Sequence, residues 1–342
     1  MQKNTKRTLR LIAAVVTILS IYLFAPWRFA LFYLTPLPPT IQAQVEQAAE
    51  QNIDGIILYV DRPNAEPMRF ARGWHDRNKQ IPASADALFK IGSIAKLYHA
   101  AAVAKLAASG TLDLDKTLAD YLPSLKDEFE YADKITLRMM VQHTSGLPNY
   151  TDHPDFSWGK SMAFDASLKL ALDMDTTFKP GTDYGYSNTN YLLLKQIMAD
   201  SIGVASSQYI QQEILDRHGL DNTYFSVKDV DLDRLMSGYH IGYEQDFKEL
   251  DQGMVATAQD VAMFLRALNE GTLFTDAERD IYANLYEFNH SGWVLGYNSN
   301  ARYDKASKTA VVQFINTTGE DTVLLTKMIN QRVWDILFAS YL

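Results

Sequence analysis

Two stretches of this chain place a serine three residues before a lysine, and one of them lies where a nucleophile needs it. Ser93 and Lys96 stand at the start of an apolar, Ala-rich segment (residues 94–108), so a helix there brings both side chains to one face. Serine needs an adjacent base, and a lysine desolvated by apolar neighbours loses its proton more readily. The positive end of the helix dipole favours negative charge beside Ser93. The pair predicts acyl-transfer chemistry.

The Ser-x-x-Lys spacing is a weak signal by itself, because about one chance match is expected in a chain of this length. Ser157 and Lys160 form a second match. They lie in a polar, loop-like segment between Pro154 and Gly159, which has no helix to begin. The alternative interpretation of Ser93 is a helix N-cap followed by a solvated lysine.

Two further motifs supply the other groups that such a reaction needs. Tyr186 and Asn188 follow a Pro-Gly loop and precede a new apolar helix. A phenol held near a lysine can be pushed towards phenolate and is a candidate general base, while Asn188 can bind a substrate amide. His290, Ser291 and Gly292 begin a strand-like segment, where glycine lets a ligand approach closely. The ordinary alternatives are a turn tyrosine and a loop histidine.

In this order, the motifs resemble those of the serine penicillin-recognising enzymes: class C β-lactamases, low-molecular-mass penicillin-binding proteins and related esterases. Other segments that carry the resemblance are residues 73–74, 89–96, 143–148, 253–260 and 311–316. The resemblance implies an α+β fold in which helices flank an antiparallel sheet. A helical region is then inserted between the N- and C-terminal strands.

The resemblance also implies a role for each motif residue. Ser93 is then the nucleophile, Lys96 its proton partner, and Tyr186 the general base that later acts as the acid. The remaining site residues are Asn188, His290 and Ser291 for binding substrate, with the backbone N–H groups of Ser93 and Trp293 as the oxyanion hole. This scheme uses no cofactor, and the scattered histidines form no His-Glu-x-x-His zinc motif.

The third motif departs from the family's common pattern. Family β-lactamases and D,D-peptidases usually carry Lys-Thr-Gly or Lys-Ser-Gly there, whereas this chain has His290. An imidazole with its ordinary pKa of about 6.5 is mostly neutral at neutral pH and attracts a carboxylate less strongly. We expect hydrolysis of amides or esters, on cell-wall D-amino-acid peptides or on small acyl substrates, rather than efficient β-lactam hydrolysis. A non-catalytic penicillin-binding or sensor module is the alternative from another class.

The spacing of apolar and polar residues predicts the elements that position these motifs. Residues 53–60, 68–74 and about 290–316 read as strands, and residues 93–269 as mostly helical with two motif loops. Residues 320–342 read as a terminal amphipathic helix. Strands from both ends of the chain should pair in one antiparallel sheet, with the helical middle packed against it and the cleft between them.

The first forty residues predict a membrane anchor. An uncharged run from residue 11 to residue 27 is near the short limit of about 17 residues for a membrane span. The basic side chains before it favour a cytoplasmic N-terminus and are Lys3, Lys6, Arg7 and Arg10. A cleaved signal peptide is the alternative, although Pro26 directly after Ala25 makes a poor cleavage site. Residues 35–40 would be a stiff Pro-rich spacer.

Charge agrees with this division into an anchor with its spacer (residues 1–40) and a hydrolase domain (residues 41–342). The whole chain carries −9 and the first forty residues carry five basic and no acidic side chains, so the remainder carries −14. Such an acidic body argues against nucleic acid as a partner. The absence of cysteine excludes disulfides and thiol catalysis. We expect a membrane-anchored domain in the periplasm or outside the cell, with a peptide or small acyl substrate.

Overall fold

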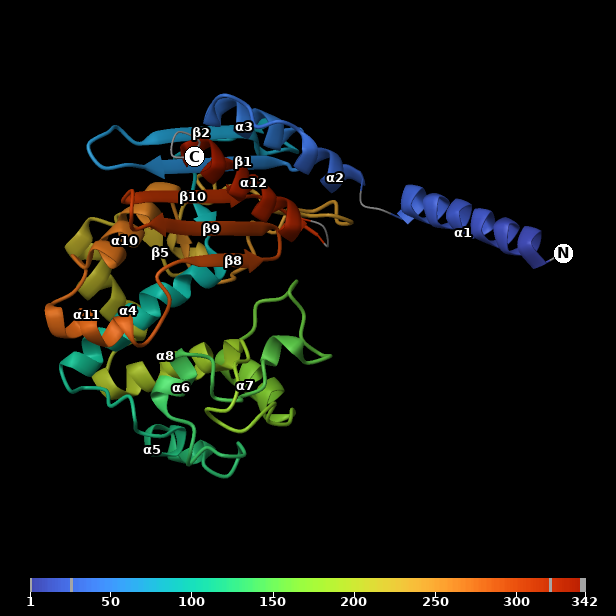
Figure 1. The fold of residues 1–342 in the computed structure, drawn as a ribbon. Helices are drawn as coiled ribbons and strands as arrows, with labels where there is room; N and C mark the ends of the chain where they lie inside the picture. The colour runs from blue at the N-terminus through green and yellow to red at the C-terminus, as the bar shows by residue number, and fades with distance from the viewer. Residues whose placement is uncertain (1, 25–26, 320–321, 339–342) are drawn as a thin grey trace. The chain divides into compact units, whose positions relative to one another are not determined.

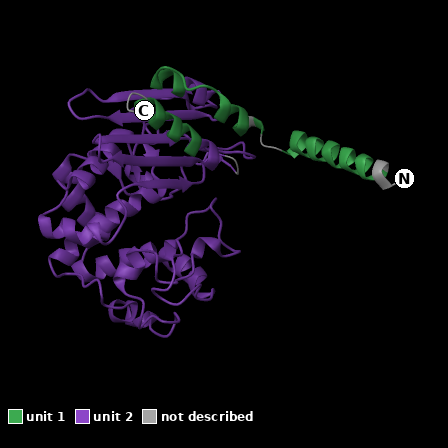
Figure 2. Cartoon of the chain, in the orientation of Figure 1, with its two compact units in different colours: residues 1–44, 327–342 green, residues 45–326 purple. Residues whose placement is uncertain are grey.

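The computed structural model describes residues 2–24, 27–319 and 322–338 (Figure 1). The chain forms two compact units, residues 1–44 with 327–342, and residues 45–326 (Figure 2). The signal-peptide site considered at residues 25–26 and both ends of the predicted terminal helix lie outside the described residues.

Helices occupy the two ends and the middle of the chain, and strands lie between them. The α-helices are α1 Gln2–Phe24, α2 Trp27–Leu34, α3 Ile41–Ala49, α4 Ala95–Ala108, α5 Leu118–Tyr121, α6 Leu137–Val141, α7 Phe164–Leu172, α8 Asn188–Ile202, α9 Ser206–Ile210, α10 Ala258–Glu270, α11 Asp276–Ala283 and α12 Thr322–Phe338. The strands are β1 Gly55–Asp61, β2 Met68–Asp76, β3 Ile81–Pro82, β4 Phe89–Lys90, β5 Thr223–Tyr224, β6 Tyr239–His240, β7 Val255–Ala256, β8 His290–Val294, β9 Tyr297–Asp304, β10 Thr309–Ile315 and β11 Thr317–Thr318. Short helical turns are η1 Gly92–Ile94, η2 Pro123–Leu125, η3 Tyr150–Asp152, η4 Gln211–Leu215, η5 Asp216–His218 and η6 Val227–Asp229.

Residues 45–326 are built on a six-stranded sheet in the order β3-β2-β1-β10-β9-β8. Every pairing in it is antiparallel, and Ile56 of β1 lies opposite Ile315 of β10. Strands from the beginning and the end of the chain therefore meet at the centre of the sheet. This confirms the predicted α+β fold, with its helical region inserted between N- and C-terminal strands.

The central strands and α4 form the core that fixes the segment around Ser93. β10 is buried along its whole length, which fits its nearly continuous apolar sequence. Phe89 of β4 stacks on Phe314 of β10, with ring centroids 4.5 Å apart. Further along the chain, Tyr98 of α4 stacks on Phe264 of α10. The segment between β4 and α4 is thus held at both ends by packed aromatic rings.

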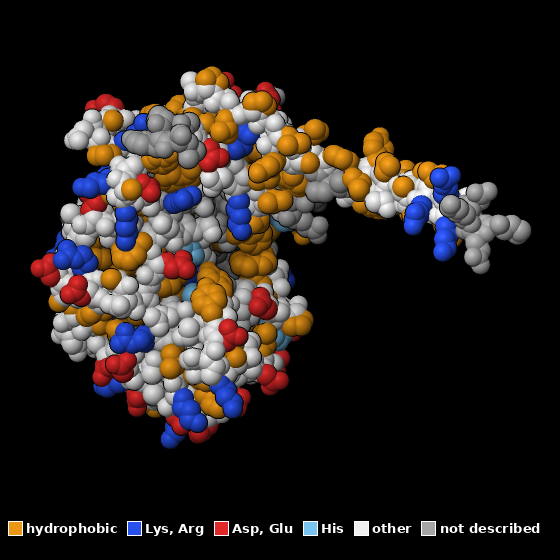
Figure 3. All heavy atoms as spheres, in the orientation of Figure 1, with side chains coloured by type: hydrophobic (Ala, Val, Ile, Leu, Met, Phe, Trp, Pro, Cys, Tyr) orange, Lys and Arg blue, Asp and Glu red, His pale blue; other side chains and the backbone are white. Residues whose placement is uncertain are grey.

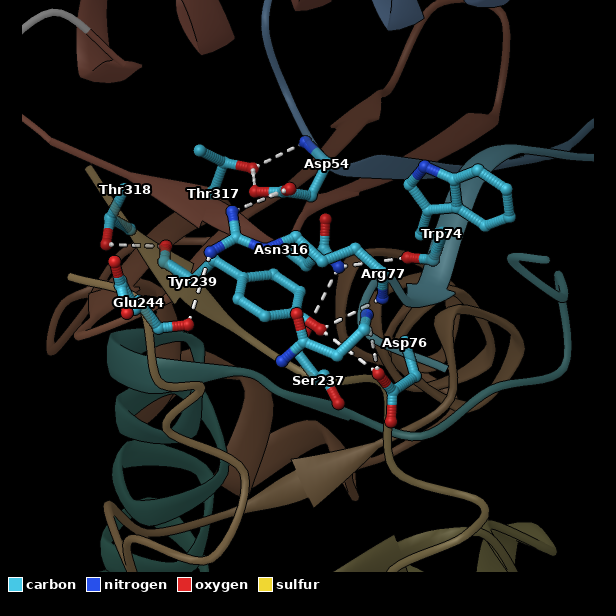
Figure 4. A network of polar contacts seen from close by, with 11 residues as sticks. Asp54, Trp74, Asp76, Arg77, Ser237, Tyr239, Glu244, Asn316, Thr317 and Thr318 are labelled. Atoms are coloured by element: carbon cyan, nitrogen blue, oxygen red, sulfur yellow. Dashed lines mark hydrogen bonds and ion pairs between the residues drawn. The ribbon is translucent and has the colours of Figure 1, made fainter. Parts of the chain in front are cut away.

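A polar network lies where β1 begins and β2 ends (Figure 4). The Arg77 guanidinium pairs with Asp54 at 3.0 Å and lies 4.0 Å from the centroid of the Tyr239 ring. The Arg77 backbone N–H donates to the Tyr239 hydroxyl at 3.0 Å. These contacts fix β6 beside the ends of β1 and β2, and β6 is the start of the loop that leads to β7.

In the other unit, α1 contains an apolar stretch, Thr5–Phe24, with a mean hydropathy of 1.7. It is long and apolar enough to cross a membrane, a test that a signal sequence near the N-terminus also passes. Hydrophobic side chains run along α1, and Lys and Arg side chains gather near its N-terminal end (Figure 3). The predicted membrane segment is therefore a helix with an exposed apolar surface.

Arg332 of α12 holds the first residues of the predicted spacer. Its guanidinium donates to the carbonyl oxygens of Thr35 at 2.8 Å and Pro36 at 3.0 Å, and to the Gln44 side chain at 2.8 Å. A guanidinium provides several donors in a fixed fork, so one side chain can satisfy all three acceptors. The prolines in the sequence are enough to predict a stiff spacer. The contact with Arg332 is visible only in the structure, because that residue is far away in the sequence.

Candidate active site

Ser93 lies in the 3-10 turn η1, directly before α4. The α-helix thus begins two residues later than Ser93, and Ile94 occupies its N-cap without a capping side chain. Gly92 has a φ of +53°, in the left-handed region that glycine adopts without strain. A Cβ at Gly92 would lie 2.9 Å from the Trp293 nitrogen. Glycine therefore lets η1 lie against β8.

The structure brings the predicted residues of the first two motifs into hydrogen-bond contact. The Ser93 Oγ lies 2.6 Å from the Tyr186 Oη, and the Lys96 Nζ donates to Ser93 Oγ at 3.3 Å. Lys96 also donates to the Asn188 Oδ1 at 2.9 Å, and its Nζ lies 4.8 Å from the centroid of the Tyr186 ring. Lys96 is only 7% exposed, so the alternative of an N-cap followed by a solvated lysine is wrong.

Burial sets the protonation of this group. Desolvation lowers the pKa of Lys96 to about 7, and the charge of Lys195 contributes to the same shift. Desolvation raises the pKa of Tyr186 to about 12, against the opposing hydrogen bond from Ser93. Above pH 7 the lysine is therefore a neutral amine and the tyrosine keeps its proton. Burial thus opposes the expectation that the lysine pushes Tyr186 towards phenolate, because the lysine loses its charge at a lower pH than the tyrosine loses its proton.

The loop at residues 143–148 supports the second motif. The His143 ring stacks on the Tyr186 ring with centroids 4.5 Å apart, and its Nδ1 accepts the Ser187 backbone N–H at 3.2 Å. Ser145 donates to the Asn190 side chain at 2.6 Å. Burial lowers the pKa of His143 to about 3, so the ring is neutral at physiological pH. The sequence placed this loop in the family pattern without revealing that it holds Tyr186.

At the third motif, His290 is engaged on both ring nitrogens. Its Nδ1 donates to the Ser291 carbonyl at 2.6 Å, so its Nε2 accepts from the Tyr286 hydroxyl at 3.0 Å. Burial lowers the pKa of His290 to about 4 despite the opposing carbonyl contact. Titration near 6.5 was therefore the wrong expectation. Sequence reasoning also missed Tyr286, whose only signal is its position four residues before the histidine.

The backbones of β8 and η1 lie in close contact beside Ser93. A Cβ at Gly292 would collide with the carbonyl oxygen of Ile91, so only glycine fits there. Ser299 of β9 donates to the same carbonyl at 2.8 Å. Together with the approach of Gly92 to the Trp293 nitrogen, this brings the two backbone segments of the predicted oxyanion hole together.

An aromatic row extends from Trp293 of β8 into the loop at residues 150–158. The Trp293 ring meets the edge of the Trp158 ring with centroids 5.1 Å apart, and Trp158 meets Phe156 at 5.0 Å. Phe156 in turn contacts Tyr150 at 5.6 Å. Such edge-to-face contacts make a connected apolar surface from segments that are distant in sequence.

Other candidate chemistry finds no support at the described positions. Ser157 lies in a turn, where its Oγ accepts the Gly159 backbone N–H, and Lys160 is exposed. Among the described residues, no three His, Cys, Asp or Glu side chains gather closely enough to hold a metal ion. The second Ser-x-x-Lys match is therefore a surface turn.

Comparison with known sequences gives one family. The model of the beta-lactamase family matches residues 41–329. A beta-lactamase of Pseudomonas fluorescens is 28% identical over 208 residues, which cover 60% of this chain and 55% of that protein. Protein flp of Staphylococcus aureus (strain MW2) is 27% identical over 154 residues, covering 45% of this chain and 31% of that protein. The chain thus spans about half or less of these relatives.

Comparison with solved structures gives the same fold. A D-amino acid amidase from Ochrobactrum anthropi SV3, complexed with L-phenylalanine, has a TM-score of 0.77 and 20% identity, covering 88% of this chain and 99% of that chain. A penicillin binding protein from Bacillus halodurans has a TM-score of 0.71 and 20% identity, covering 83% and 98%. These likenesses show the β-lactamase/transpeptidase-like architecture.

Proposed function

Because the chain belongs to the beta-lactamase family and is a serine hydrolase, we propose that Ser93 attacks the carbonyl carbon of amide and ester substrates to form an acyl-enzyme. One observation carries this proposal. The Ser93 hydroxyl lies between two proton carriers, 2.6 Å from the Tyr186 oxygen and 3.3 Å from the Lys96 nitrogen. Both carriers are displaced from their ordinary pKa values by burial.

The protonation of the pair supports a division of labour that differs from the one implied by family resemblance. Neutral Lys96 accepts the Ser93 proton as Oγ bonds to the substrate carbon. Protonated Tyr186 then donates to the leaving amine or alkoxide as the carbon–leaving-group bond breaks. The Lys96 ammonium returns a proton to the phenolate, which restores both groups. Water hydrolyses the acyl-enzyme by the same transfers in reverse.

Charge that develops on the substrate oxygen needs fixed donors. The backbone N–H groups of Ser93 and Trp293 are our candidates, because Gly92 and Gly292 let their segments touch. One such donor contributes about 3–4 kcal/mol to transition-state stabilisation. Asn188 is also placed to meet a substrate amide, because its side chain is oriented by accepting from Lys96 at 2.9 Å and donating to Thr151 at 3.3 Å.

The electrostatics favour substrates without a carboxylate at the third motif. His290 is neutral and hydrogen-bonded to Tyr286, so it supplies no fixed positive charge there. Amides and esters of small acyl groups fit this better than penicillins. Because a D-amino acid amidase is among the similar folds, D-amino acid amides are the first substrate class to test. Cell-wall D-amino-acid peptides, which end in a carboxylate, are the second. We place the enzyme outside the cytoplasm, anchored by α1 with its basic N-terminal flank.

Profiling of the full-length chain in detergent micelles tests this function. The substrates are D-phenylalanine amide, a p-nitrophenyl ester, a D-Ala-D-Ala peptide and a chromogenic cephalosporin. We expect turnover of the amide or ester, and labelling of Ser93 by a fluorophosphonate. Ser93→Ala should abolish both, whereas the matched variant Ser157→Ala should retain both. Labelling that persists in Ser93→Ala would overturn the assignment, and acylation without turnover would favour the binding or sensor module.

A further inference from the structure

Lys90 is a second buried lysine beside the nucleophile, and the reaction described above does not use it. It lies three residues before Ser93, in β4, and is 1% exposed. Its Nζ donates to the carbonyl oxygens of Phe247 and Leu250 at 2.5 Å each, and to the Gln252 side chain at 3.4 Å. All three acceptors belong to one loop, residues 247–252, which we call the tethered loop.

The tethered loop is fixed independently at its beginning. It follows β6, which the Arg77 network holds against the sheet (Figure 4). The Phe247 backbone N–H donates to the Gly238 carbonyl at 2.9 Å. The rest of the loop has no strand partner, and Lys90 supplies contacts to its middle and end. Loss of the ammonium group should therefore loosen residues 247–252 while β6 stays in place.

The far side of the tethered loop contacts the aromatic row at the active site. The Gln252 side chain donates to the Trp158 carbonyl at 3.5 Å, and Ser161 donates to the Asp251 carbonyl at 3.0 Å. The Trp158 ring meets the Trp293 ring, and the Trp293 backbone nitrogen lies beside η1, the turn that contains Ser93. A continuous series of contacts thus runs from Lys90 through the tethered loop to Trp158 and Trp293. The backbone N–H of Trp293 is one of our candidate oxyanion donors.

We propose that Lys90 is a positioning residue: through the tethered loop it fixes the Trp158–Trp293 pair as one wall beside the substrate and so favours substrates whose acyl group is aromatic. The proposal rests on the acyl-enzyme function above and adds a specificity determinant to it. Lys90 touches no reacting atom. Burial lowers its pKa to about 7, and the carboxylates of Asp251 and Asp246 oppose this by favouring its charged form.

The test compares Lys90→Met with Lys105→Met in the full-length chain. Lys105 is also a buried lysine, 9% exposed, but it pairs with Glu278 at 3.2 Å, away from the tethered loop. The substrates are the p-nitrophenyl esters of phenylacetate and acetate. Lys90→Met should raise KM for the arylacetyl ester about 3- to 10-fold, the loss of affinity expected when one aromatic contact is displaced. Values of kcat, and both constants for acetate, should stay within about twofold.

Gln252→Ala guards against a simple folding defect, because it leaves Lys90 and its two carbonyl contacts in place. It should also raise KM for the arylacetyl ester, but by a smaller factor than Lys90→Met does. Combined with Trp158→Ala, Lys90→Met should add nothing further, because both act on the same wall. Equal losses of kcat/KM for both esters in Lys90→Met would overturn the proposal. These values are first corrected for the fraction of the chain that the fluorophosphonate labels at Ser93.

A readout without turnover separates this proposal from the proposed function. Lys248 lies within the tethered loop and is only 8% exposed, so trypsin should cleave after it slowly in the native chain. Lys90→Met should accelerate that cleavage several-fold, and Lys105→Met should not. Unchanged cleavage in Lys90→Met would refute the tether even in an active enzyme. A chain that shows accelerated cleavage but no acylation at Ser93 would refute the proposed function alone.

Discussion

Lys90 and Lys96 stand three residues to either side of Ser93, and their environments are alike in burial but differ in their partners. Both are buried, and burial lowers the pKa of each to about 7. Lys90 donates to backbone carbonyls of the tethered loop, whereas Lys96 donates to the side chains of Ser93 and Asn188. A displaced pKa therefore marks burial, and only the acceptors distinguish Lys96, our proposed proton acceptor for Ser93, from Lys90.

Local geometry separates the two lysines. Lys90 lies in the short strand β4, and its side chain reaches the tethered loop. Lys96 lies one turn after Ser93, where the i and i+3 positions share a face. The change from strand to helix at Gly92 thus gives two nearby amines different hydrogen-bond partners.

Removal of the Lys96 amine should have the largest effect. Lys96→Met leaves Ser93 without a proton acceptor, so kcat/KM should fall about 10⁴-fold, the upper end for a general base. Amide and p-nitrophenyl ester should suffer alike, because both need the serine proton removed. Lys90→Met, measured beside it, should lose no more than about tenfold on any substrate. Similar losses in the two variants would erase the distinction between them.

Loss of the Tyr186 hydroxyl should come next and should depend on the leaving group. Tyr186→Phe keeps the ring that stacks on His143 but removes the proton donor. Amide hydrolysis should slow about 10²- to 10³-fold, within the range for a general acid. A p-nitrophenolate leaves without a proton, so ester hydrolysis should slow far less. Equal losses on both substrates would instead make Tyr186 the base, as the family resemblance implies.

The sequence was sufficient to predict the fold and a set of motif residues that lie together in the structure, but not their protonation or support. The apolar runs that became β1 and β10, and the motif spacing around Ser93, are local signals. The pairing of Tyr286 with His290 and the tether from Lys90 depend on burial and on contacts across the fold. Those are tertiary properties, so an ordinary pKa of 6.5 for His290 was the wrong starting point.

A fixed charge at the third motif should have a moderate, substrate-specific effect. His290→Lys adds an ammonium group where the wild type has a neutral ring. A charge-assisted contact with a carboxylate is worth roughly 1.5–3 kcal/mol, so kcat/KM for a D-Ala-D-Ala peptide should rise up to about 10- to 100-fold. A neutral p-nitrophenyl ester should not respond, and His290→Gln is the uncharged control. A similar change on both substrates would show that position 290 does not face the carboxylate.

The smallest effect, a change in the pH profile, distinguishes the two lysines most directly. Below pH 7 Lys96 is protonated and cannot accept the Ser93 proton, so kcat/KM should fall about tenfold per pH unit and level off above pH 7. His290, with its pKa lowered to about 4, and Tyr186, with its pKa raised to about 12, titrate outside this window. Titration of Lys90 itself should not shape this profile, because a neutral amine at Lys90 still donates to Phe247 and Leu250. Lys90→Met should therefore scale kcat/KM for an arylacetyl ester across the whole profile without moving its inflection. If the inflection near pH 7 disappears in Lys90→Met, Lys90 is the titrating group, and the assignment of proton acceptor to Lys96 has to be reversed.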